Sequence, residues 1–206
     1  PTAKYLFNNA GLRCPEGQVS HISSAINEKM FPLPYVIKPL NEGSSVGVHI
    51  IQNKEALITL KQEPWPHEKE VLVEEYIPGR EIQVAVMGER ALGAIEICPR
   101  GEFYDYETKY TEGKAEHFMP APIHPQSYAE ALDIALKAHR ILGCRGVSRA
   151  DFRYNDKNGE PGTLYLLEVN TQPGLTPLSL VPEIAAYNGI KFSELISWMV
   201  ENASCD

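Results

Sequence analysis

Several chemistries are excluded by what this 206-residue sequence lacks. Its four cysteines are scattered and form no Cys-x-x-Cys pair, so neither a zinc site nor a disulfide framework is predicted. Scattered cysteines are typical of proteins kept in a reducing cytoplasm. The sequence has no His-Glu-x-x-His and no Gly-x-Ser-x-Gly, which excludes the common signatures of zinc proteases and serine hydrolases.

Long apolar runs and basic clusters are also missing. No stretch approaches the apolar length of a membrane-spanning helix, and the first residues do not resemble a signal peptide. Nineteen Lys and Arg residues stand against 27 Asp and Glu residues, giving a net charge of −8. We therefore expect a globular cytoplasmic protein with neither nucleic-acid nor membrane partners. An anionic ligand such as ATP would need local positive charge and a bound metal.

Proline and glycine divide the remaining sequence into short elements. The chain begins at Pro1, without methionine and inside a helix-like pattern that ends at Gly11, so we interpret it as a fragment. The turn at Pro78 and Gly79 is the predicted boundary between a small α/β lobe (1–78) and a larger lobe (79–206). A long polar segment, about 100–118, is the expected lid loop, since long loops in compact domains are usually functional or disordered.

Hydrophobic periodicity predicts the elements of these lobes. A Ser-x-x-Glu capping box at Ser127 predicts the start of a helix that ends at Gly143. Other helices are predicted at 2–10, 55–61 and 192–200. Strands are predicted at 35–39, 48–51, 71–77, 81–87, 91–98, 147–154 and 164–169.

The most informative segment is the end of the last predicted strand. Residues i and i+2 of a strand point to the same face, so Glu168 and Asn170 emerge together while Leu167 and Val169 face the core. Two oxygen ligands on one rigid edge suit Mg²⁺, which keeps waters and substrate phosphates as its other ligands. The alternative interpretation is a polar strand end that faces solvent.

A second polar group lies on the 147–154 strand. Asp151 is a candidate third oxygen ligand, and Arg149, two residues earlier, shares its face. Arg149 would then lie beside phosphate or beside an oxyanion formed during a reaction. The alternative is a structural ion pair between Arg149 and Asp151, which is common in sheets and contributes little.

Three further features are open to two interpretations. Lys38 and the loop 42–47 are suited to phosphate binding, because small residues let backbone N–H groups approach a phosphate closely. The alternative is a simple turn beside an exposed lysine. The aromatic, charged segment 103–110 is either a lid that excludes water or an anchored surface loop. Glu74, Glu75 and Glu81 flank the Pro78 turn, where a carboxylate either accepts from ribose hydroxyls or is solvated.

Taken together, these stretches resemble the ATP-grasp fold, and closely the D-alanine–D-alanine ligases. The order and spacing of the matching motifs cover nearly the whole chain. They are Val-Ile-Lys-Pro at 36–39, Glu-Gly-Ser-Ser-Val-Gly at 42–47, Phe-Tyr-Asp-Tyr-Glu-Thr-Lys-Tyr at 103–110, Gly-Val-Ser-Arg-Ala-Asp at 146–151 and Leu-Glu-Val-Asn-Thr-Gln-Pro-Gly-Leu-Thr at 167–176. The resemblance implies an α+β fold of two α/β lobes with nucleotide bound between two antiparallel sheets.

The resemblance also implies a role for each matching residue. Lys38 would contact ATP phosphate, and Lys109 would reach the γ-phosphate. The hinge that reads adenine would be formed by Glu74, Glu75, Tyr76 and Ile77, and Glu81 would hold ribose. Asp151, Glu168 and Asn170 would bind two Mg²⁺ or Mn²⁺ ions. Arg149 and the N–H of Gly174 would stabilise a tetrahedral oxyanion, Ser179 and Leu180 would lie near the carboxylate of the second D-alanine, and Ser44 and Tyr110 would link the small-lobe loop to the closed lid.

The implied activity is the ATP-dependent joining of two D-alanines through a D-alanyl phosphate, for peptidoglycan synthesis, by a homodimeric enzyme. From the resemblance we expect that the family's N-terminal domain is missing from this chain and that the fragment alone is inactive. Glu75 stands where relatives often carry a basic residue near adenine.

Two alternatives stay open at this point. One is a ligase that uses D-lactate as its acceptor, against which Tyr110 speaks, since depsipeptide-forming relatives tend to replace it. The other is a nucleotide-binding module without catalysis, against which the complete set of charged site residues speaks.

Overall fold

A computed structural model describes residues 1–27, 30–42, 46–62, 69–99, 115–176 and 179–204. In these ranges, no helix has both the length and the apolar character needed to cross a membrane. The helices are α1 (Thr2–Asn9), α2 (Ile22–Asn27), α3 (Lys54–Lys61), α5 (Pro125–Ile141), α6 (Leu180–Tyr187) and α7 (Phe192–Glu201). The strands are β1 (Gly17–His21), β2 (Tyr35–Pro39), β3 (His49–Ile51), β4 (Glu70–Glu75), β5 (Arg80–Met87), β6 (Arg90–Pro99), β7 (Ala115–Phe118), β8 (Val147–Asn155) and β9 (Thr163–Asn170).

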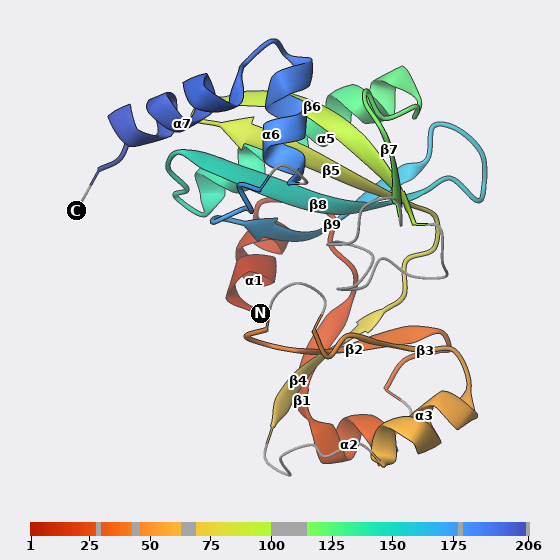
Figure 1. The fold of residues 1–206 in the computed structure, drawn as a ribbon. Coiled ribbons are helices and arrows are strands. Elements are labelled where there is room, and N and C mark those ends of the chain that lie inside the picture. Colours follow the sequence, from red (N-terminus) through yellow and green to blue (C-terminus); the bar gives the residue numbers. More distant parts are fainter. Residues whose placement is uncertain (28–29, 43–45, 63–68, 100–114, 177–178, 205–206) are drawn as a thin grey trace.

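The smaller sheet has the strand order β1-β4-β2-β3, and its strands pair antiparallel. One face packs on α2 and α3 through a core that includes Ile37, Leu60 and Val73. Because side chains alternate along a strand, Lys38 and Glu74 lie on the opposite face. Figure 1 shows this sheet with its two helices below the rest of the molecule.

The larger sheet has the strand order β7-β6-β5-β8-β9, again with antiparallel neighbours. Helix α5 packs on one face through small residues such as Ala131 and Ala135, which contact a core containing Phe152. A second core, which includes Ile95 and Ile184, packs α6 and α7 against the opposite face. This sheet is therefore a three-layer structure over much of its area.

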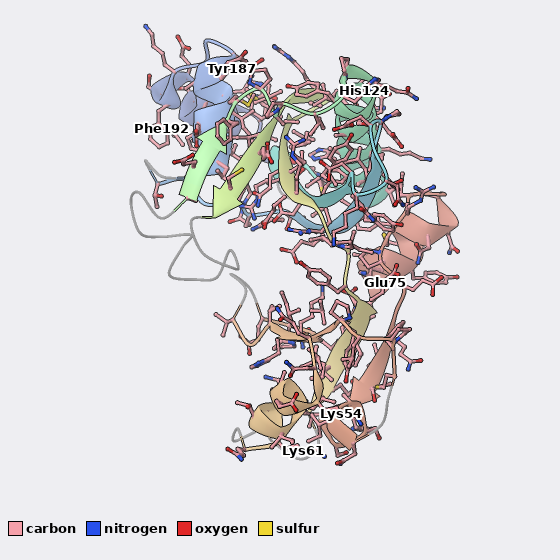
Figure 2. All side chains as sticks on the ribbon, turned by 90° about the vertical axis from the view of Figure 1, so that its right-hand side faces the viewer. Lys54, Lys61, Glu75, His124, Tyr187 and Phe192 are labelled. Atoms are coloured by element: carbon pink, nitrogen blue, oxygen red, sulfur yellow. The ribbon has the colours of Figure 1, made fainter. Side chains whose placement is uncertain are left out.

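Helix α1 belongs to the larger core although it comes first in the chain. Phe7, Leu12 and Cys14 pack in the core that α5 covers. The sequence placed these residues with the smaller lobe, and their packing joins them to the larger sheet instead. The boundary at residue 78 itself stays a prediction; Glu75, just before it, lies at the narrow connection between the upper and lower parts of Figure 2.

The predicted strands and three of the predicted helices are close to the observed elements, but the capping box is wrong. Helix α5 begins at Pro125, and the His124 side chain accepts a hydrogen bond from the N–H of Gln126 at 3.2 Å. Ser127 is buried inside the helix, where its Oγ accepts from the Tyr154 hydroxyl at 3.1 Å. Packing against the sheet therefore overrides the local signal. Helix α6 was not predicted.

Candidate active site

The sheet face turned away from α5 carries the predicted ligands. Ala150 and Phe152 of β8 point into the core under α5, so Arg149 and Asp151 lie on the other face. Asp151 is paired directly with Glu168 of β9, and Arg149 is paired with Asn170. The structure thus brings these four predicted site residues together on adjacent strands.

A β-bulge in β9 produces this arrangement. Leu164 and Leu166 pack in the core under α5, and strict alternation from them would also direct Glu168 into that core. The register instead passes from Phe152↔Leu166 to Asp151↔Glu168, which leaves Leu167 without a partner in the ladder. The prediction that Leu167 faces the core is therefore wrong: it is the extra residue, and it reverses the faces so that Glu168 and Asn170 lie beside Asp151.

Arg149 and Asp151 form a bidentate ion pair. Arg149 Nε donates to Asp151 Oδ1 at 2.7 Å, and an Arg149 terminal N–H group donates to Oδ2 at 2.9 Å. The Asp151 side chain is only 8% exposed, so the pair is shielded from water. The ion pair left open by the sequence is present, and a cation that binds Asp151 must share its oxygens with Arg149.

The donor set nevertheless suits a hard divalent cation. Two carboxylates and an amide supply only oxygen on one face, and Glu168 is exposed enough to reach a ligand. The Asn170 side-chain oxygen accepts from the Gln172 N–H at 3.1 Å and keeps a second lone pair. The predicted set contains only two carboxylates, and in the described ranges no three His, Cys, Asp or Glu side chains gather into a metal-binding group.

On the smaller sheet, Glu74 lies between two lysines. Lys38 Nζ is 2.7 Å from Glu74 Oε2, and Lys4 of α1 contacts the other carboxylate oxygen. Glu74 is 3% exposed, so this carboxylate is buried with its counter-charges. Burial lowers the pKa of Lys4, with Glu74 acting in the opposite direction. The sequence predictions missed Lys4, because a single lysine on a short helix carries no recognisable signal.

The predicted adenine-reading segment and the predicted ribose carboxylate lie together. Glu75 Oε1 accepts from the Glu16 N–H at 2.9 Å. Glu81 is on β5, where it accepts at 3.3 Å from the side-chain amide of Gln83, a buried residue paired with Asp151. Arg153 contacts the carbonyl oxygens of Ile77 and Gly79 from β8. The segment after β4 is therefore fixed to the larger sheet.

The loop after β9 places the predicted acceptor residues. Ser179 Oγ accepts from the Thr176 N–H at 2.9 Å, and it would lie 2.8 Å from a Cβ added to Gly174, so a larger residue there would crowd the serine. Leu180 is buried in the core beneath α6, which leaves its backbone rather than its side chain for a ligand. Ser44, Lys109 and Tyr110, with most of the predicted lid, lie outside the described residues.

Known proteins are similar to this chain in sequence and in fold. A family model described as "D-ala D-ala ligase C-terminus" matches residues 12–201. A D-alanine–D-alanine ligase of Paramagnetospirillum magneticum is 54% identical over 206 residues, and one of Granulibacter bethesdensis is 52% identical over 203 residues. The matches cover 99% and 98% of this chain but 67% and 66% of those relatives, so the chain spans about two thirds of their length.

Solved structures give the same result. The crystal structure of a D-alanine–D-alanine ligase from Bacillus anthracis has a TM-score of 0.76 at 27% identity, with 97% of this chain and 65% of that chain covered. The VanG D-Ala:D-Ser ligase from Enterococcus faecalis has a TM-score of 0.79 at 30% identity, with 97% and 59% covered. A structure of the Bacillus anthracis enzyme complexed with ATP is also similar, with a TM-score of 0.73 at 28% identity.

Proposed function

The chain belongs to the D-alanine–D-alanine ligase family, and we propose that it is the ATP-binding and catalytic part of an enzyme that joins two D-alanines. Its two antiparallel sheets have the ATP-grasp fold of those ligases. The observation that supports the activity most directly is the grouping of Arg149, Asp151, Glu168 and Asn170 on one sheet face, within a sequence about half identical to named ligases.

We propose two lobes that meet near residue 78, with α1 packed on the larger one and nucleotide held between the sheets. Lys38 contacts phosphate from the smaller sheet, and its neighbour Glu74 keeps it oriented. Backbone groups of the segment from Glu74 to Ile77, which includes Glu75 and Tyr76, read the adenine edge. Glu81 accepts from the ribose hydroxyls, and Lys109 reaches the γ-phosphate from the lid.

Asp151, Glu168 and Asn170 are the residues that would hold two Mg²⁺ or Mn²⁺ ions. Such ions supply charge neutralisation at a transferring phosphoryl group. Arg149, released in part from Asp151, is then placed to stabilise negative charge on the reacting carbonyl. The N–H of Gly174 is the second donor to that oxygen, because oxyanions are stabilised by fixed donors.

The chemistry follows from the weakness of a carboxylate as an electrophile. The carboxylate of the first D-alanine takes the γ-phosphoryl group of ATP, giving ADP and an acyl phosphate. The amine of the second D-alanine attacks the acyl carbon, the new C–N bond replaces the C–O bond, and phosphate and a proton leave. Ser179 and the backbone of Leu180 orient the second substrate, while Ser44 and Tyr110 close the lid against water.

We further propose that the enzyme acts in the cytoplasm as a homodimer and that its dipeptide is used for peptidoglycan. D-Lactate as acceptor and a catalytically silent nucleotide-binding module remain the competing functions. The VanG D-Ala:D-Ser ligase is 30% identical to this chain, so D-serine is a further acceptor to compare.

The deciding experiment measures phosphate release from Mg-ATP by this chain joined to the N-terminal part of a relative. D-Alanine, L-alanine, and D-alanine with D-lactate or D-serine are supplied in separate reactions. We expect phosphate release in the reaction in which D-alanine is the only substrate added to Mg-ATP. Release only when D-lactate or D-serine is added would change the acceptor. Mg-ATP binding without release in any reaction would leave a nucleotide-binding module.

A further inference from the structure

One arginine on the larger sheet holds the segment that connects the two sheets. Residues 76–79 lead from β4 to β5, and Arg153 reaches them from β8. Arg153 Nε donates to the carbonyl oxygen of Ile77 at 3.1 Å, and a terminal N–H group of the same side chain donates to the carbonyl of Gly79. The planar guanidinium therefore bridges two carbonyls of one short segment, which an ammonium group cannot do in the same way.

Gly79 brings this segment against β8 at the same point. Its φ is +108°, a conformation that side chains rarely adopt. A Cβ at this position would lie 2.1 Å from the carbonyl oxygen of Tyr154 and 2.9 Å from the Cα of Asn155, both backbone atoms. The connecting segment thus lies in close backbone contact with β8, and Arg153 fixes it there by hydrogen bonds.

The same guanidinium extends to two residues of the proposed nucleotide site. Its carbon lies 6.0 Å from the centre of the Tyr76 ring, within the range of a cation–π contact. Arg153 Nη1 lies 3.9 Å from Glu81 Oε2, and the two side chains are 21% and 17% exposed. One side chain therefore contacts the backbone on both sides of Pro78, the aromatic ring before it and the carboxylate after it.

We propose that Arg153 is a positioning residue that gives the site its preference for adenine nucleotides. This inference rests on the proposed function, in which the backbone near Ile77 reads the base and Glu81 reads the ribose. Recognition of a base edge needs a backbone donor and acceptor at fixed positions, and a carboxylate must face both ribose hydroxyls. Arg153 holds these groups without touching the phosphates, which are assigned to Lys38 and the lid.

The test compares three ligands, Mg-ATP, Mg-GTP and Mg-tripolyphosphate, by calorimetric titration of this chain. Arg153→Met is expected to weaken ATP binding about tenfold, the loss of roughly one charged hydrogen bond, and to leave tripolyphosphate binding nearly unchanged. The ratio of ATP to GTP affinity falls with it. Arg153→Lys, which keeps the charge but loses the fork, gives an intermediate ratio.

Arg140→Met is the matched control, because Arg140 is an exposed arginine on α5 that pairs with Glu89. It is expected to leave all three affinities unchanged. Hydrogen exchange of residues 76–81 without nucleotide is expected to be faster in Arg153→Met than in the control, at an equal melting temperature.

Two results would overturn the inference while leaving the proposed function intact. One is an unchanged ATP-to-GTP ratio in Arg153→Met and in Arg153→Lys. The other is an equal loss of affinity for all three ligands, which is the mark of a general structural defect. Failure of the unsubstituted chain to bind Mg-ATP would instead overturn the proposed function, and the inference with it.

Discussion

The two sheets of this protein are stabilised by different means. The smaller sheet packs one face on two helices, and its core is apolar, with residues such as Ile37 and Val73. The larger sheet is covered on both faces over much of its area. Among the described residues, the buried polar side chains other than Glu74 and the Tyr35 hydroxyl belong to the larger sheet or to α5. The larger sheet is therefore the part in which orientation is specified by hydrogen bonds as well as by packing.

Polar pairs connect neighbouring elements of the larger sheet. Arg80 of β5 donates to both carboxylate oxygens of Glu96 on β6, at 2.7 and 2.6 Å, and these bonds raise the pKa of Arg80. His139 of α5 lies 2.7 Å from the Ser148 hydroxyl on β8, measured from Nδ1. These bonds fix β5 to β6 and α5 to β8, on the face of the sheet opposite the ligands of the candidate site. The contrast teaches that the larger sheet holds the predicted ligands on a framework fixed by hydrogen bonds and packing, whereas the smaller sheet, held mainly by packing, contributes Lys38 from the other side of the site.

The largest test of this contrast removes one core side chain from each sheet. Phe152→Ala in the larger sheet is expected to lower the free energy of unfolding by about 4 kcal/mol, and Ile37→Ala in the smaller sheet by about 3 kcal/mol. Both side chains are fully buried. Urea unfolding, followed by fluorescence and by hydrogen exchange, gives both values.

The location of the change separates the two sheets. Ile37→Ala is expected to speed exchange only in the smaller sheet, whereas Phe152→Ala speeds it in both, because the connecting segments are anchored to β8 and β9. Equal exchange patterns for the two variants would show that the molecule is one cooperative unit and would remove the contrast.

A smaller effect concerns the ligand face of the larger sheet. Glu168→Gln keeps the shape of an exposed side chain but removes a hard anionic ligand, so Mg-ATP affinity is expected to fall about tenfold. Calorimetric titration with and without Mg²⁺ measures this change. Affinity for ATP without metal stays the same.

The matched control is Glu130→Gln, because Glu130 is also an exposed glutamate but lies on α5, on the other side of the sheet. It is expected to bind Mg-ATP as the unsubstituted chain does. A fall in metal-free ATP affinity in Glu168→Gln would assign Glu168 to nucleotide contact rather than to metal binding.

The smallest effect comes from the buried histidine. Burial lowers the pKa of His139 below its ordinary value of 6.5, with Glu89 and Arg140 acting in opposite directions nearby. The unfolded chain then binds more protons than the folded one below pH 6.5, so His139 makes the protein less stable as the pH falls from there.

His139→Gln is the variant that isolates this contribution. The substitution is expected to lower the free energy of unfolding by about 1 kcal/mol near pH 8, because it weakens the bond to Ser148. The variant is expected to lose stability less steeply than the unsubstituted protein as the pH falls. Urea unfolding at pH 8 and at pH 5.5 measures both changes. Parallel losses in the two proteins would assign the acid sensitivity to other groups.

Much of the fold was predictable because the strands are short, apolar and bounded by proline or glycine. The grouping of Asp151, Glu168 and Asn170 on one sheet face was also predictable, since these residues sit at the ends of recognisable strands; their role as metal ligands stays a prediction. What sequence periodicity missed depends on contacts between distant segments. Ser127 has the local pattern of a helix cap, but the Tyr154 hydroxyl in the facing strand makes it a buried helix residue.

Two other features, the positions of Lys4 and Arg153, had no sequence signal at all. Lys4 reaches Glu74 only because α1 packs beside it in the folded chain. Arg153 reaches the carbonyl of Ile77 only because the connecting segment packs against β8. The ion pair of Arg149 with Asp151 was one of two interpretations, and only the pairing of their atoms identifies it.

The single extra residue in β9 has a consequence for how this strand tolerates change. Because Leu167 is one extra residue, even-numbered side chains face α5 before it and face the predicted ligand site after it. Replacing Leu167 by another residue leaves that arrangement intact. Deleting it turns Glu168 and Asn170 towards the layer beneath α5 and exposes Val169 in their place, although every ligand is still encoded. In this strand, the number of residues decides which side chains face the site as much as the identity of each residue does.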